Sequence, residues 1–186
     1  MLVIGTRGRV GIEKALLGSV AEQILHQTVC PVITVGPENT ITNGSHSFEI
    51  DRILFATDFS SGSRAAAPYA ISLAQENEAE LDLLHVVTKQ EAGDLRHVGD
   101  LATDWIHRLE QIVPHDAGLW CRPEYLVQIG DAAERILEIA RLRHAQLIVL
   151  GAKCVLDYSS ACTHIPWSTA HKVIAHANCP VLTVRG

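Results

Sequence analysis

The feature that most constrains the fold is a stretch of sequence that occurs twice, near the start and at the end of the chain. Residues 30–35 read CPVITV and residues 179–184 read CPVLTV, which differ by one conservative change. The segments before them also match, with an apolar run, a glycine-containing loop and a helix-like segment in each copy. The second copy carries three additional residues between its loop and its helix. Self-similarity of this kind indicates two copies of one structural unit.

Between the two copies, strand-like and helix-like segments alternate. Apolar runs typical of buried strands occupy residues 52–56, 81–87, 124–127, 146–150 and 181–184. Segments with apolar residues at helical spacing occupy residues 64–77, 100–112, 131–144 and 168–176. Strands alternating with helices predict right-handed β-α-β units and a parallel sheet covered on both faces. This pattern predicts one complete five-stranded, doubly wound α/β domain.

The same pattern predicts three parts along the chain. Residues 51–186 contain all five strands and form the complete domain. Residues 1–36 correspond only to its last β-α-β unit, so they are predicted to be a partial second copy. Residues 37–50 are polar and contain the turn-forming pair Asn43-Gly44, which is typical of a linker.

Composition excludes several classes of protein. The chain has 186 residues, 47% of them hydrophobic, which is enough for a real core. Its net charge of -6 argues against a nucleic-acid partner, which would require a basic surface. There is no apolar run long enough to span a membrane and no secretory signal pattern. The five cysteines have no disulfide-framework spacing. We therefore expect a soluble, cytoplasmic protein with no membrane or nucleic-acid partner.

The glycine-containing loop of the first copy has the chemistry of a phosphate site. It follows the apolar run and reads G-x2-G-x9-G-S, formed by Gly5, Gly8, Gly18 and Ser19. Glycines let backbone amides approach a phosphate closely. Ser19 and Glu22 form a capping box, and the helix that they begin favours an anion at its N-terminus. The alternative interpretation is that the glycines only form a strand-to-helix turn.

The corresponding loop of the second copy is altered. It keeps Gly151 and Ser168, but Cys154 replaces the second glycine and Trp167 replaces the third. A side chain at position 154 disfavours positive φ, by roughly 1 kcal/mol. The indole of Trp167 stands where the backbone would meet a ligand. We therefore predict that the phosphate side of this second site does not function.

These segments, together with ILFATDFS at residues 53–60 and LLHVV at residues 83–87, resemble the universal stress protein family. The chain looks like a tandem member of that family that begins within its first domain. The resemblance implies the strand order 3-2-1-4-5 and an ATP site that uses the G-x2-G-x9-G-[ST] motif. It also implies that Asp58, at the end of the first strand of the complete domain, helps to hold the nucleoside. Val87 and Gly130 are predicted to complete the nucleoside side of the pocket.

Neither copy is predicted to have a complete site. The first copy keeps the phosphate loop but lacks the strands that would supply the acidic residue and the wall for adenine. The second copy keeps the residues of the nucleoside side, but its phosphate loop is altered. We therefore expect a nucleotide (ATP)-binding type of universal stress protein in which ATP binds weakly or not at all. No base–nucleophile pair is visible in the sequence, so we expect no enzyme activity.

Two alternative functions remain open at this stage. One is an association or scaffold module in which the nucleotide site is vestigial. The other is a metal or thiol sensor in the segment 154–171, which contains the ligand-type residues Cys154, Asp157, Cys162, His164 and His171. These residues have no standard zinc spacing, so structural roles are favoured and no metal is expected.

The resemblance also implies an assembly. In this family the last strands of two domains pair antiparallel, so residues 32–35 should lie against residues 181–184 within one chain. Residues 2–4 would then form a sheet edge with unpaired backbone groups. A two-fold dimer is the commonest way to cover such an edge. We therefore predict a homodimer or larger assembly in which residues 1–25 contribute to the contact.

Overall fold

The computed structural model describes residues 1–6, 19–36, 49–88, 98–114, 121–152 and 168–186. The strands of this described part are β1 (Leu2–Gly5), β2 (Val32–Val35), β3 (Arg52–Ala56), β4 (Glu80–Val87), β5 (Pro123–Ile129), β6 (Leu147–Ala152) and β7 (Val181–Arg185). Its helices are α1 (Ser19–Gln27), α2 (Ser61–Asn77), α4 (Val98–Glu110), α5 (Ala132–Leu142) and α6 (Ser168–His176). The predicted linker, residues 37–50, lies almost wholly outside the described residues.

The strands form one sheet in the order β1-β2-β7-β6-β3-β4-β5. All neighbouring strands are parallel except β2 and β7, which are antiparallel. The predicted α/β class with a mostly parallel sheet is confirmed. The described sheet has seven strands, however, where the sequence predicted a five-stranded sheet preceded by a partial unit. The difference arises because β2 pairs with the edge strand β7, so that β1 and β2 continue the same sheet.

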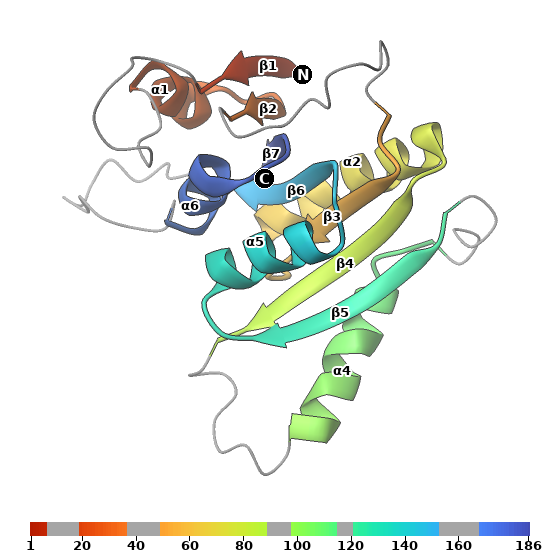
Figure 1. Ribbon diagram of the computed structural model, residues 1–186. Coiled ribbons are helices and arrows are strands. Elements are labelled where there is room, and N and C mark those ends of the chain that lie inside the picture. The colour runs from red at the N-terminus through yellow and green to blue at the C-terminus, as the bar shows by residue number, and fades with distance from the viewer. Residues whose placement is uncertain (7–18, 37–48, 89–97, 115–120, 153–167) are drawn as a thin grey trace.

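Helices cover both faces of the sheet (Figure 1). Successive strand residues point to opposite faces, so Ile53 and Phe55 of β3 pack on one side and Leu54 on the other. Helices α1, α5 and α6 cover the face that contains Leu54. Helices α2 and α4 cover the face that contains Phe55. The core is almost entirely aliphatic, as the low aromatic content requires.

The two CPV repeats meet in the antiparallel pair of β2 and β7. Ile33 lies opposite Leu182 at the centre of this pair. On either side, the Thr34 hydroxyl donates to the Val181 carbonyl at 3.1 Å, and the Thr183 hydroxyl donates to the Val32 carbonyl at 3.3 Å. Both threonines are buried. The two hydrogen bonds join equivalent positions of the repeats, so the pairing has an approximate two-fold axis. The predicted contact between residues 32–35 and residues 181–184 is confirmed.

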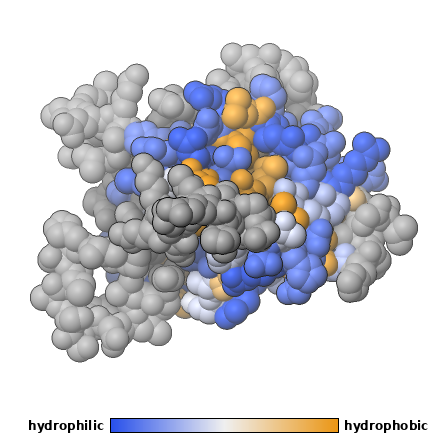
Figure 2. Space-filling view, turned by 90° about the horizontal axis from the view of Figure 1, so that it is seen from below, coloured by the Kyte–Doolittle hydropathy of each residue, from blue (hydrophilic) through white to orange (hydrophobic). Residues whose placement is uncertain are grey.

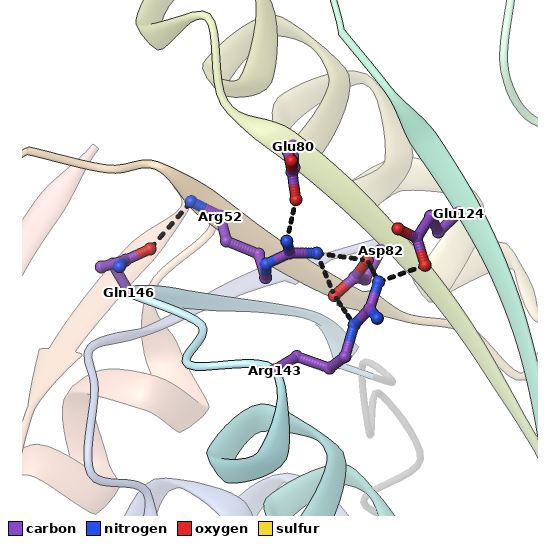
Figure 3. A network of polar contacts seen from close by, with 6 residues as sticks. All are labelled: Arg52, Glu80, Asp82, Glu124, Arg143 and Gln146. Carbon is purple, nitrogen blue, oxygen red and sulfur yellow. Dashed lines mark hydrogen bonds and ion pairs between the residues drawn. The ribbon is translucent and has the colours of Figure 1, made fainter.

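A network of ion pairs lies at the amino ends of the central strands (Figure 3). Its centre is Asp82 of β4, whose side chain is 0% exposed. Arg52 donates to Asp82 at 3.1 Å, and Arg143 donates to both carboxylate oxygens, from Nε at 3.1 Å and from Nη2 at 3.0 Å. Glu80 pairs with Arg52, and Glu124 pairs with Arg143. The hydrogen bond with Asp82 raises the pKa of Arg143 further above its ordinary value. The network joins three strands to the end of α5.

Several large apolar side chains are exposed in the described part of the chain, two of them on β1. Figure 2 shows one face, where hydrophilic residues dominate and hydrophobic residues gather in small patches. On β1, Leu2 is 37% exposed and Val3 is 61% exposed, at the outer edge of the sheet. No helix in the described part of the chain is both long and apolar enough to cross a bilayer.

Candidate functional site

The candidate site is a cavity at the carboxyl ends of β3 and β6. The chain runs from β3 outward through β4 and β5, and then returns to place β6 on the other side of β3. Helix α2, which follows β3, packs on one face, and α6, which follows β6, packs on the other. Ligands of doubly wound folds bind in the crevice that such a reversal creates. A cavity of about 230 Å³ lies at this point in the described structure.

The cavity has an apolar floor and a polar rim. The floor comes from strand and helix residues Ala56, Leu84, Val86, Ile136, Leu150 and Ala170. The rim includes Thr57, Asp58, Ser60, Ser63 and Thr169. This combination of many apolar contacts and a few oriented polar groups is typical of small-molecule sites.

Hydrogen bonds fix the loop that follows β3. The Thr57 hydroxyl accepts from the Phe59 N–H at 3.0 Å and donates to the Ser63 hydroxyl at 3.0 Å. Asp58 accepts from the Ser60 N–H at 3.0 Å, which is an Asx turn. These bonds hold the exposed Asp58 carboxylate at the rim of the cavity.

Three helices begin beside the cavity. Ser60 caps α2 by accepting from the Ser63 N–H, and Asp131 caps α5 by accepting from the Glu134 N–H at 3.1 Å. Thr169 and Ala170, in the first turn of α6, line the cavity as well. Because a helix N-terminus carries partial positive charge, the rim favours a polar or anionic group of a ligand.

The structure brings together some of the predicted site residues. Asp58 and Gly151 both line the cavity. Val87 and Gly130 lie together, since the Gly130 N–H donates to the Val87 carbonyl at 3.1 Å, but neither is among the described lining residues. Val86 lines the cavity instead. Side chains alternate along β4, so Leu84 and Val86 face the cavity whereas Val87 faces the opposite side of the sheet.

Gly151 has a packing role that its sequence context does not reveal. A Cβ atom on this residue would lie 2.2 Å from the Ser63 nitrogen and 2.3 Å from the Gly62 carbonyl carbon. The absence of a side chain therefore lets the first turn of α2 pack directly on the end of β6. This close packing brings Ser60 and Ser63 to the rim.

Gly5, the described glycine of the first-copy motif, is not among the residues that line this cavity. Gly5 ends β1, which is separated from β6 in the sheet by β2 and β7. Ser19 is the first residue of α1, and Ser168 is the first residue of α6. Gly8 and Gly18 lie outside the described residues, as do Cys154, Asp157, Cys162, His164 and Trp167 of the second copy.

Sequence reasoning missed the serines and Thr169 of the rim. Ser60 and Ser63 follow Asp58 at the spacing of a helix cap, and this is the signal that could have identified them.

Burial makes two of the described thiols, Cys121 and Cys179, poor nucleophiles. Cys30, Cys121 and Cys179 are free, and burial raises the pKa of Cys179 to about 12. Burial also raises the pKa of Cys121. Cys30 and Cys179 occupy equivalent places in the two repeats, but Cys30 is only half-buried. Within the described residues no group of three or more metal-ligand side chains comes together.

Comparison with known proteins agrees with the fold and the repeat. The pattern of the Universal stress protein family matches residues 1–36 and 49–185. Universal stress protein YxiE of Bacillus subtilis is 30% identical over 149 residues, which cover 73% of this chain and 99% of YxiE.

Two solved structures show the same fold. The crystal structure of a universal stress protein from Archaeoglobus fulgidus DSM 4304 is 26% identical, with a TM-score of 0.69. The match covers 98% of this chain but only 61% of that protein, so the chain spans less than two thirds of its length. A universal stress protein crystallised in complex with cAMP is 18% identical over 74% of this chain and 98% of that one, with a TM-score of 0.54. On the match of the family pattern to both parts of the sequence, the chain belongs to the universal stress protein family.

Proposed function

We propose that the chain is a non-enzymatic, nucleotide-binding stress protein of the cytoplasm, and that the cavity between β3 and β6 receives the nucleoside. The observation that carries this proposal is the position of Asp58. Its carboxylate lies at the rim of an apolar cavity, at the reversal of strand order where doubly wound folds bind nucleotides. A carboxylate there can accept hydrogen bonds from ribose hydroxyls or from an amino group of the base.

The altered loop of the second copy favours the nucleoside over a whole triphosphate. The loop that would hold further phosphates carries Cys154 and Trp167 in place of two glycines. A universal stress protein of the same fold has been crystallised with cAMP, a nucleotide with one phosphate. This supports binding of a nucleoside or monophosphate.

The proposal includes no catalytic turnover. Asp58 is the one ionisable side chain among the described lining residues, and the rest of the rim consists of hydroxyl groups. General acid–base or nucleophilic catalysis needs a second group, such as a histidine within reach of a serine. The described rim offers no such pair.

We expect adenosine, AMP, cAMP and ATP to bind with similar, weak affinity. Each should have a dissociation constant above about 100 μM, a binding free energy no more favourable than about −5.5 kcal/mol. The reason is that the additional phosphates of ATP find no intact glycine loop. Isothermal titration calorimetry on nucleotide-free protein measures all four constants. ATP binding in the low micromolar range would contradict the expectation, and no binding of any of the four at millimolar concentration would overturn the proposed function.

The contribution of Asp58 can be measured separately. Asp58→Asn should weaken adenosine binding by about tenfold, because hydrogen bonds to a charged group are worth about 1.5–3 kcal/mol. The matched control is Asp51→Asn. Asp51 is also exposed, but it precedes β3 and so lies at the amino end of that strand, away from the cavity. The control should bind adenosine as the parent does. Equal effects of the two substitutions would show that Asp58 has no specific role.

Self-association is a second proposed property, and the exposed edge of β1 favours it. β1 pairs only with β2 in the described sheet, and its Val3 side chain is 61% exposed. An apolar edge strand of this kind pairs readily with another chain. We expect a homodimer in sedimentation at tens of micromolar.

A lysine on the edge should separate the two subunits. Val3→Lys is expected to give a monomer, because charged side chains on an edge strand oppose pairing. Val29→Lys is the control, since Val29 is 89% exposed but precedes β2. A monomeric parent protein, or dissociation by the Val29 substitution alone, would rule out the β1 contact.

A further inference from the structure

The loop at the rim of the cavity contains a backbone conformation that needs support. Phe59 has φ of 58°, in the left-handed region that non-glycine residues rarely adopt. Two other described non-glycine residues share this property, Glu78 and His144. Both follow helices, where a left-handed residue is ordinary. Phe59 instead lies between Asp58 and Ser60, two residues of the rim. Backbone strain at such a place points to a functional constraint.

Aromatic and cationic side chains hold the ring of Phe59. Trp105 of α4 stacks on it, with ring centroids 5.6 Å apart and an interplanar angle of 19°. The centroid of the His85 ring lies 4.8 Å from the centroid of the Phe59 ring. The Arg108 guanidinium lies over both the Phe59 ring, at 4.3 Å, and the Trp105 ring, at 4.4 Å. Each contact is of a favourable stacking or cation–π type. We call Phe59, His85, Trp105 and Arg108 the aromatic clamp.

The clamp also holds the backbone of the loop. His85 Nδ1 donates to the Thr57 carbonyl oxygen at 2.9 Å. The Thr57 N–H donates to the Leu84 carbonyl at 2.9 Å, so both sides of Thr57 are tied to β4. The same histidine ring packs against Trp105, with centroids 4.3 Å apart. A displacement of Trp105 would therefore reach Thr57 through His85 and Phe59 through direct stacking.

The clamp and the cavity lie on opposite sides of the sheet. Phe59 packs against the core beneath α2 and α4, whereas the cavity floor belongs to the core beneath α5 and α6. Asp58 and Ser60, on either side of Phe59, are at the cavity rim. If Phe59 left the left-handed region, the hydrogen bond from the Ser60 N–H to Asp58 would have to break or move.

We propose that Trp105 and Arg108 are positioning residues for the nucleotide site, and that they act from the far face of the sheet by holding Phe59 in its left-handed conformation. This inference rests on the proposed function for its ligand but not for its effect on the loop. A purely structural role for the clamp would lower stability and leave the conformation of the folded loop unchanged.

The decisive experiment combines removal of the Trp105 ring with a residue at position 59 that adopts the left-handed conformation without support. Trp105→Ala removes the stacking, and Phe59→Asn introduces a residue that tolerates the left-handed region. Trp105→Ala should shift the backbone amide resonances of Asp58 and Ser60 and change the three-bond HN–Hα coupling of Phe59 in nucleotide-free protein. It should also weaken adenosine binding by about fivefold, whereas the double variant should bind within about twofold of the parent.

Three further variants complete the design. Trp105→Phe keeps a stacking ring and should behave as the parent does. Arg108→Ala, at an exposed position, should shift the same loop resonances and weaken adenosine binding, but less than Trp105→Ala does. It replaces Trp105→Ala in the experiment if that variant does not fold. Tyr69→Ala removes an aromatic ring that is 42% exposed on α2, and should change neither the loop resonances nor binding.

Unchanged Asp58 and Ser60 resonances in folded Trp105→Ala would overturn the inference, as would a double variant as impaired as the single one. If the variants shift the Asp58 and Ser60 resonances as expected but the parent protein binds no nucleotide, the role of the clamp is supported and the proposed function is overturned. The two proposals therefore fail separately.

Discussion

Asp82→Asn is expected to lower the free energy of unfolding by about 3–5 kcal/mol. Asp82 is 0% exposed, and in the described part of the chain Arg52 and Arg143 compensate its buried charge. The neutral Asn side chain would remove the negative charge between the two guanidinium groups, and its NH₂ group could not accept their hydrogen bonds. Figure 3 shows Asp82 between the two arginines, with Glu80 beside Arg52 and Glu124 beside Arg143. Urea denaturation followed by circular dichroism measures the loss.

Glu124→Gln is the matched control for this substitution. Glu124 belongs to the same network, but its side chain is 49% exposed. Solvent-exposed ion pairs contribute about 0–1 kcal/mol, so the control should lose no more than that. Equal losses for the two variants would show that burial of Asp82 does not set the strength of the network.

Gly151→Ala is expected to have the second large effect. The added methyl group would lie 2.2 Å from the Ser63 nitrogen, and the atoms that it meets are backbone atoms of α2. Helix α2 must then move away from β6, which should lower the free energy of unfolding by about 3 kcal/mol. Because the helix carries Ser60 and Ser63, adenosine binding should weaken as well. Thermal denaturation and calorimetry measure the two effects.

The repeat supplies the control. Gly5 occupies the equivalent place in the first copy, but a Cβ atom there would meet no described atom within 4 Å. Gly5→Ala should therefore change the free energy of unfolding by less than about 0.5 kcal/mol. If the two variants were equally stable, the close approach of α2 to β6 would not be a constraint on residue 151.

The repeat and the alternation of elements were sufficient to predict the fold class, and the family resemblance implied the contact between β2 and β7. Periodicity could not predict a single sheet of seven strands, because strand pairing depends on which edge is free. The family resemblance pointed to Asp58, which lines the cavity at the carboxyl end of β3. The sequence analysis did not name Val86, which lines the cavity, because the side chains of adjacent strand residues point to opposite faces of the sheet.

Other contacts depend on residues far apart in the sequence. Arg143 lies near the end of the predicted helical segment 131–144. In the structure it reaches Asp82, 61 positions earlier. The clamp likewise joins Phe59 to Trp105 of another element. No local pattern could have indicated either contact.

The pairing of β2 with β7 has a consequence for how the chain is made. Its two threonine hydrogen bonds join residues 147 and 151 positions apart, which gives this part of the sheet a high contact order. On the ribosome, residues 32–35 emerge long before residues 181–185. At about 5–20 residues per second, the first strands wait on the order of ten seconds for their partner. Docking of the first repeat onto β7 therefore follows synthesis of all the strands between them. During that interval the apolar residues of β1 and β2 are available to chaperones, to proteases or to another nascent copy.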